Sequence, residues 1–196
     1  MQIRSAPLRF IIRFFVTLAV AYALWHFTAP LANKIFTFFA RNVVMALDGT
    51  GYTHNILAKG RYIVITYQAS KKWDATDHTV EYKGYTVNMV FLVALIMAVP
   101  QVNYKLRLKI LLLGLLILFP VQIFKFVIYV FNYYCQNMRR KSGAFIYPAY
   151  MHHAIGYADR IMWRIDLQII PVIIWAGLFY YYKWHNIFTK LMKKRP

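Results

Sequence analysis

The hydrophobic positions of the chain gather in four long runs that are separated by shorter polar segments. A transmembrane helix needs about 20 mostly apolar residues, and each run approaches that length. The predicted spans are residues 10–28, 87–102, 110–134 and 167–182. The second run is the shortest and needs Tyr85 and Thr86, or Tyr104, to complete it. The pattern predicts an all-α polytopic membrane protein with about four transmembrane helices in a single integral membrane domain over residues 1–196.

The segment after the first run has the period of an amphipathic helix. Within residues 31–47, the only charged side chains are Lys34 and Arg41. The apolar side chains that gather near one helical face are Ile35, Phe38, Phe39, Val43 and Val44. A helix with one apolar face and few charges is typical of the membrane interface. We therefore predict an interfacial amphipathic helix here.

From Asp48 onward, glycine residues separate short runs that are rich in β-branched and aromatic residues. Such runs predict strands when turn signals bound them. The two runs are residues 61–67 and 79–85, and the turn signals are Lys59-Gly60 and Lys83-Gly84. We expect a small β element within an extracytoplasmic loop over residues 48–86.

Composition supports a membrane protein and the charge distribution predicts its orientation. Hydrophobic residues make up 60% of the chain and charged residues 15%, with a net charge of +18. The basic residues lie mainly at the ends of the runs, which argues against nucleic acid and for contact with anionic lipid headgroups. The short segments on one side carry basic residues without an acid, so we expect both termini in the cytoplasm and the protein in the inner membrane. Residues 135–164 form a second predicted extracytoplasmic segment.

Several side chains outside the runs suggest chemistry. Cys135 is the only cysteine, which excludes an intramolecular disulfide, and basic neighbours stabilise a thiolate, so it is a candidate nucleophile. His152 and His153 suit acid–base or metal chemistry, but adjacent helical side chains diverge. The alternative is an interfacial segment whose His and Arg side chains, including Arg160, meet lipid phosphates. A weak cation site is conceivable in a predicted loop that carries Asp74, Asp77 and His78. We expect no metal site and no cofactor.

Lys125 lies in the middle of the third run, with Gln122 on the same helical face. A charge near a bilayer centre costs roughly 2.5–3.5 kcal/mol on insertion scales, so it normally faces a bundle interior or a wet cavity. We expect Lys125 to be buried and to face the second extracytoplasmic segment. The alternative is that its side chain snorkels to an interface.

The order of these features resembles the exosortase/archaeosortase family of membrane-embedded protein-sorting cysteine transpeptidases. Residues 61–66 and 79–87 resemble the β-rich stretch of that family, and residues 84–100 resemble its span-opening segment. Residues 122–125 stand where an Asn-x-x-Arg element is expected, and residues 152–156 fit His-x-x-x-Gly. The motif-equivalent positions are Tyr85, Thr86, Gln122, Lys125, His152 and Gly156.

The chain departs from the pattern of that family at the residues that carry its reaction. Tyr85 or Thr86 stands where the resemblance implies a nucleophilic cysteine, and neither forms a thioester. Lys125 replaces the arginine and lacks its bidentate fork, so of the expected residue types only His152 remains.

These departures leave three functions open. We expect a non-catalytic partner or accessory in envelope protein sorting that contacts another membrane or secreted protein. One alternative is an active membrane cysteine transpeptidase, for which Cys135, His152 and Lys125 are the catalytic candidates. The other is a structural subunit of a larger membrane complex.

Overall fold

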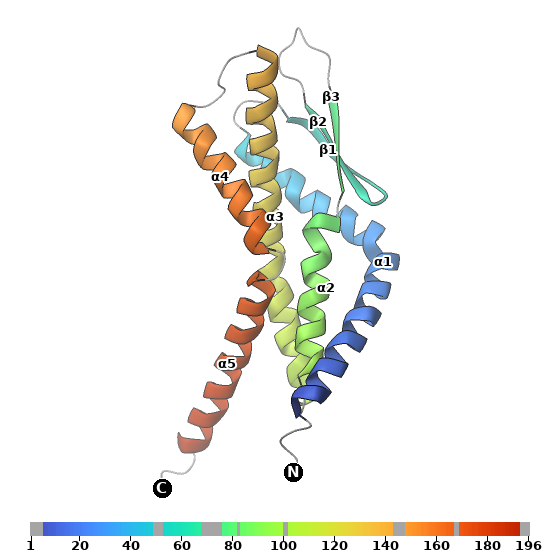
Figure 1. Ribbon diagram of the computed structural model, residues 1–196, viewed down its shortest axis with the longest axis vertical. Helices are drawn as coiled ribbons and strands as arrows, with labels where there is room; N and C mark the ends of the chain where they lie inside the picture. Colours follow the sequence, from blue (N-terminus) through green and yellow to red (C-terminus); the bar gives the residue numbers. More distant parts are fainter. Residues whose placement is uncertain are drawn as a thin grey trace. The chain divides into compact units, whose positions relative to one another are not determined.

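The computed structural model describes residues 6–48, 53–67, 76–81, 83–99, 102–142, 148–166 and 169–192. Most of these residues are helical, and a small sheet lies between the first and second helices in the chain (Figure 1). The elements are α1 (Ala6–Leu47), β1 (Thr53–Lys59), β2 (Tyr62–Tyr67), β3 (Thr76–Glu81), α2 (Lys83–Ala98), α3 (Tyr104–Ser142), α4 (Ala149–Asp166) and α5 (Ile169–Met192). The largely helical class with a small β element is therefore confirmed.

Two of the described helices are long and apolar enough to cross a membrane. They are the stretches Pro7–Leu47 and Tyr104–Asn137, and a third span is reached if α4 and α5 are counted as one broken span. The short apolar helix Gly84–Ala98 corresponds to the run predicted at residues 87–102 and begins at the tyrosine end. The four-span topology and the single domain over residues 1–196 stay predictions.

The first predicted span and the predicted interfacial helix form one continuous helix, α1. Pro30 lies between them and does not end the helix, because a proline removes one backbone donor while the flanking turns continue. The second half of α1 is also apolar on more than one face. Ile35, Phe38, Phe39 and Val43 are exposed as expected for a membrane-facing side, whereas Val44 is buried.

The chain divides into two compact units. The first unit comprises Met1–Ala23, Asn88–Phe119 and Asp166–Pro196. Its core contains Leu92, Ile96, Ile110 and Leu118, with side chains of α5 packed against them. Gly114 allows α2 to approach closely, since an added Cβ would lie 3.1 Å from Leu92 Cδ2. Arg107 donates to the carbonyl of Val99 at 2.7 Å and so caps the carboxyl end of α2.

The second unit comprises Leu24–Val87 and Pro120–Ile165 and contains the sheet. The strands lie in the order β1-β2-β3, and both pairs are antiparallel. Side chains alternate along β2, so that one face of the sheet is buried. The buried apolar side chains of the sheet are Ile56, Ile63, Ile65, Tyr67 and Val80. Those of α1 and α3 in the same unit include Phe36, Ala40, Phe126 and Val130.

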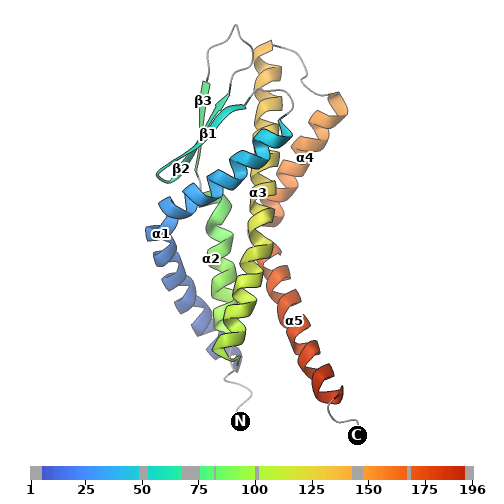
Figure 2. The ribbon, with the colours of Figure 1, turned by 180° about the vertical axis from the view of Figure 1, so that it is seen from behind.

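A polar contact fastens the β1–β2 hairpin to α1, and both views show the second half of α1 beside the sheet (Figures 1 and 2). The buried Asn33 Nδ2 donates to the carbonyls of Gly60 and Tyr62, each at 2.9 Å. Thr37 Oγ1 in turn donates to Asn33 Oδ1 at 3.0 Å. Gly60 has a φ of +62° at the turn, a conformation that favours glycine.

The sequence prediction of the β element was right about its place and wrong in two details. β1 was not predicted, because its sequence Thr-His-Asn-Ile-Leu-Ala-Lys has few β-branched residues. The Lys83-Gly84 pair was predicted as a turn after a strand that ends at Tyr85, but it begins α2. Strand β3 ends at Glu81, so Tyr85 and Thr86 are helical.

Candidate functional site

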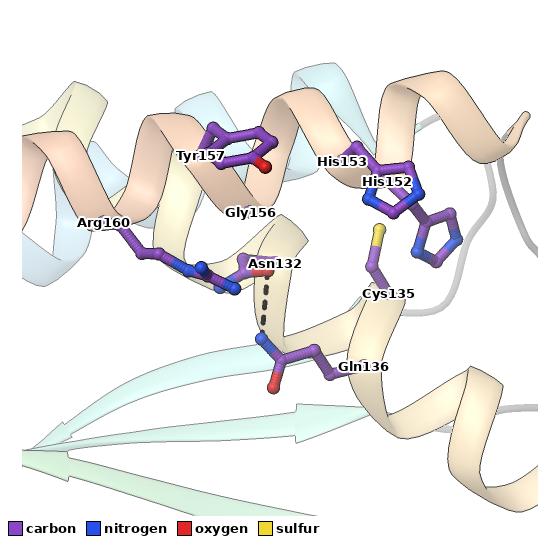
Figure 3. Close-up of a pocket in the computed structure, with 8 residues that line it drawn as sticks. All are labelled: Asn132, Cys135, Gln136, His152, His153, Gly156, Tyr157 and Arg160. Carbon is purple, nitrogen blue, oxygen red and sulfur yellow. Dashed lines mark hydrogen bonds between the residues drawn. The ribbon is translucent and has the colours of Figure 1, made fainter.

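The second unit contains a cavity of about 240 Å³ between α3 and α4. Its lining residues are polar or small and come from two successive turns of α3 and from one face of α4. They are Asn132, Cys135, Gln136, His152, His153, Gly156, Tyr157 and Arg160 (Figure 3). The lining residues of α3 lie three or four positions apart, and those of α4 recur at intervals of four positions. Both spacings place side chains on one face of a helix.

Hydrogen bonds hold the amide side chains of α3 in fixed orientations. Gln136 Nε2 donates to Asn132 Oδ1 at 3.2 Å, and Asn132 Nδ2 donates to Asp159 Oδ2 at 2.8 Å. The second of these bonds joins α3 to α4. The carboxylate of Asp159 is therefore already bonded to a neutral donor, and the lining residues themselves include no carboxylate.

The remaining lining groups make the cavity electropositive. Arg160 carries a positive charge, and His152 and His153 add two imidazoles with ring nitrogens that can form hydrogen bonds. Gly156 keeps the space open, because an added Cβ would lie 3.7 Å from Asn132 Oδ1 and a longer side chain would fill the space. The site is therefore suited to an anionic or strongly polar group.

Cys135 and His152 share this cavity, although they come from different helices. The thiol is 1% exposed, and Figure 3 shows its sulfur pointing toward the helix that carries both histidines. Helix α3 continues through Cys135 to Ser142, and the placement of residues 135–164 in a second extracytoplasmic segment stays a prediction. The side chains of Arg139 and Arg140 lie outside the described residues.

Lys125 is fully buried and lies in a second cluster, which also belongs to the second unit. Its Nζ donates to the carbonyl of Gly84 at 3.1 Å and lies 4.0 Å from the ring centre of Trp163 and 5.1 Å from that of Tyr85. The expectation that Lys125 is buried and faces residues 135–164 is confirmed, since Trp163 belongs to α4, whereas the extracytoplasmic side of these residues stays a prediction. Snorkelling to an interface is wrong, because no part of the side chain reaches the surface.

A glycine makes this arrangement of Lys125 and Trp163 possible. A Cβ added at Gly84 would lie 3.0 Å from Trp163 Cη2, which is closer than side chains normally approach. The missing Cβ lets the indole ring approach the first turn of α2. The same residue thus supplies the carbonyl that accepts from Lys125 and the space that the ring over Lys125 requires.

The motif-equivalent residues are divided between the two clusters. Tyr85 lies with Lys125, and Thr86 and Gln122 are buried polar residues of the same unit. His152 and Gly156 line the α3–α4 cavity, where Cys135 is the only lining residue with a thiol. The lining residues of that cavity do not include Tyr85, Thr86 or Lys125.

Sequence reasoning named Arg160 among the basic residues of the segment 135–164 and missed other residues of these clusters. Arg160 follows His152 at a distance of eight positions and Gly156 at four, so a helical reading of residues 149–166 places it on their face. Asn132 and Gln136 become visible in the same way once the third helix is extended. Trp163 had no comparable signal, because its contact with Lys125 depends on how α3 and α4 pack.

The structure does not bring together a metal site in the described residues. Within that part of the chain, no group of three or more His, Cys, Asp or Glu side chains is placed to hold an ion. The weak cation site was predicted in a loop, but Asp77 and His78 lie in strand β3, and Asp74 lies outside the described residues.

Two titratable side chains of the sheet have shifted pKa values. Burial lowers the pKa of His78, whose Nε2 lies 2.8 Å from Tyr129 Oη and whose ring stacks on Tyr133 at 3.8 Å between centres. Burial also raises the pKa of Tyr67 to about 12, and a hydrogen bond to Tyr133 adds to that shift. Both residues are therefore neutral when the sheet is folded at neutral pH.

Comparison with known proteins identifies the family. No curated protein and no solved structure matches the chain. A family model described as exosortase H-associated membrane protein matches residues 4–181, which is most of the chain. The resemblance to exosortases predicted from the sequence is thus confirmed at the level of an associated family, and the chain belongs to the exosortase H-associated membrane proteins.

Proposed function

We propose that this protein is a non-catalytic membrane partner of an exosortase and acts as an accessory in envelope protein sorting. The observation that carries the proposal is the family match over residues 4–181, because its description names association with an exosortase. The apolar helices Pro7–Leu47 and Tyr104–Asn137 support a location within the membrane.

The geometry of the motif-equivalent residues supports a role without covalent catalysis. Tyr85 and Thr86 are buried in α2 and offer no thiol at the position where exosortases carry one. Lys125 is held by a carbonyl and two aromatic rings, so its charge already has partners within the protein. The contacts of Lys125 lie within the second unit, and its side chain is fully buried there.

The proposal includes a membrane topology. Four spans and two cytoplasmic termini follow from the apolar runs and from the acid-free basic flanks. The sheet and the α3–α4 cavity then face the outer side of the inner membrane. The exposed apolar side chains of α1, such as Phe27 and Phe38, would contact lipid or the partner protein.

Co-purification tests the partnership. The full chain with an affinity tag is co-expressed with exosortase H and captured after solubilisation in mild detergent. We expect the exosortase to be retained by this chain and not by an unrelated polytopic membrane protein. A second readout is the processing of an exosortase substrate, which should fall when the chain is withheld. Absence of both effects would contradict the proposal.

A cysteine transpeptidase remains a second candidate, because the α3–α4 cavity holds Cys135 and His152 together. A thiol beside an imidazole is the arrangement in which a general base activates a cysteine. In this case, Cys135→Ala would abolish substrate processing, and a sorted protein would be trapped as an adduct on Cys135.

Replacement of Cys135 separates the two candidates. An accessory protein with Cys135→Ala still supports processing by its partner exosortase, because the thiol has no role in the reaction. Gly177→Ala serves as a matched control for a small helical substitution, since an added Cβ there meets nothing within 4 Å. Loss of processing with Cys135→Ala and not with Gly177→Ala would favour the transpeptidase.

A further inference from the structure

The α3–α4 cavity combines positive charge, hydrogen-bond donors and a nearby apolar surface. Arg160 and two histidines line it, and none of the lining residues is acidic. Arginine binds phosphate through parallel N–H donors, and basic pockets between membrane helices bind lipid headgroups. A volume of about 240 Å³ greatly exceeds the roughly 30 Å³ of one water molecule, so the cavity can hold an anionic group with its neighbouring atoms.

The outer surface of α4 indicates which source of phosphate fits the cavity. Four of its exposed apolar side chains lie four or seven positions apart and form one stripe, which consists of Tyr150, Tyr157, Ile161 and Ile165. His153, Arg160 and Arg164 are exposed on the same helix. A helix with an apolar stripe flanked by basic residues is typical of the membrane interface. An acyl chain would therefore find an apolar surface directly beside the cavity.

We propose that the α3–α4 cavity binds the phosphate of an anionic phospholipid headgroup, with Arg160 as the principal cation. Arg160 faces the phosphate oxygens, His152 and His153 add donors, and Tyr157 lies at the boundary between the cavity and the apolar stripe. The bond between Asn132 and Asp159 keeps the nearby carboxylate engaged by a neutral donor. This site goes beyond the accessory role, and its test does not require an exosortase.

Lipid binding to the purified full chain tests the site. The probes are phosphatidylglycerol, zwitterionic phosphatidylcholine and inorganic phosphate, added to the protein in detergent and followed by native mass spectrometry. We expect phosphatidylglycerol to bind most tightly. Arg160→Gln should weaken its binding by about fivefold or more, as expected for the loss of one charge-assisted hydrogen bond.

Two further variants make the result specific to the cavity. Arg164→Gln removes the same charge one turn along α4 from a residue that does not line the cavity, and it should leave binding within about twofold. Gly156→Leu fills the cavity without a change of charge and should weaken binding as Arg160→Gln does, while the protein elutes at the same volume in size-exclusion chromatography.

Three results would overturn the proposal. Equal weakening by Arg160→Gln and Arg164→Gln would show attraction to a diffuse basic surface instead of a site. Binding of inorganic phosphate as tight as that of phosphatidylglycerol would show a site for a free anion. Equal binding of phosphatidylcholine and phosphatidylglycerol would show that the charge of the headgroup is not recognised.

Discussion

At the scale of single residues, Lys125 shows how a carbonyl and two aromatic rings surround a fully buried ammonium group. An ammonium group loses its hydration on burial, and a carbonyl together with aromatic faces replaces part of that loss. The carbonyl belongs to Gly84 and the nearest ring to Trp163. The arrangement joins the start of α2 to α3 and α4 within the second unit, so it has a structural role.

A double-mutant cycle measures this coupling. Lys125→Met removes the cation and Trp163→Leu removes the ring. Once one substitution has been made, the other should lower the free energy of unfolding by less than it does by itself. We expect a coupling free energy of about 1–2 kcal/mol, the range for a desolvated cation–π pair. Thermal unfolding of the four proteins in one detergent provides the measurement. Additive effects would show that the ring does not stabilise the cation.

His78 makes the stability of the sheet depend on pH. Burial lowers the pKa of His78 in the folded protein, which therefore favours the neutral ring. In the unfolded chain the ring has its ordinary pKa of 6.5 and is protonated below that pH. Stability is therefore complete above about pH 6.5 and decreases as the pH falls toward the lowered pKa. We expect a lower unfolding temperature at pH 5 than at pH 7.5.

Substitution identifies the group responsible. His78→Gln cannot be protonated, so the difference between the two pH values should shrink, while His153→Gln at an exposed position should leave it in place. Thermal unfolding at the two pH values gives the comparison. A difference that persists unchanged in His78→Gln would assign the pH dependence to another group.

At the scale of elements, the hairpin depends on a side chain from α1. Asn33→Ala removes the donor to two hairpin carbonyls, at a cost of about 1–3 kcal/mol if they remain buried. Thr37→Val removes only the bond to Asn33 and should cost less. Hydrogen exchange of residues 53–67 measures both, and we expect faster exchange with Asn33→Ala. Equal exchange rates in the two variants would contradict the bridging role of Asn33.

The turn of the same hairpin provides an independent test. Gly60 has a φ of +62°, so Gly60→Ala introduces a strain of about 1–2 kcal/mol. Its Cβ meets no atom within 4 Å, so the effect comes from the backbone alone. Limited proteolysis should become faster at the hairpin, whereas Gly177→Ala in α5 should not change the rate there.

The sequence predicted elements better than it predicted their limits. Apolar runs predicted α1, α2, α3 and α5, because a long apolar helix is visible in the sequence as a run of apolar residues of similar length. β1 was missed, because its own residues have little β propensity and it is a strand through its pairing with β2. Lys125 was identified from hydropathy alone, whereas the contact of Trp163 with Lys125 depends on how α4 lies against α3. Contacts across helices are not encoded in the period of either helix.

At the scale of the whole molecule, cysteine labelling tests the proposed topology. Cys135→Ser gives a background without cysteine, because the chain has only one. Single cysteines at Ala75 and Ser142 should react with an impermeant maleimide added to intact cells. A cysteine at Met192 should react only after permeabilisation. Reaction of the cysteine at position Met192 in intact cells would contradict the proposed orientation.

The second unit has a consequence for the order in which the protein is made. Thr53 Oγ1 in β1 lies 2.7 Å from Tyr134 Oη in α3, although the two residues are 81 positions apart. Leu24–Val87 and Pro120–Ile165 build this unit, and Asn88–Phe119 belongs to the other. At about 5–20 residues per second, the ribosome takes seconds to complete that intervening stretch. The part of the sheet that contacts α3 therefore stays uncovered during translation until the later half of α3 emerges.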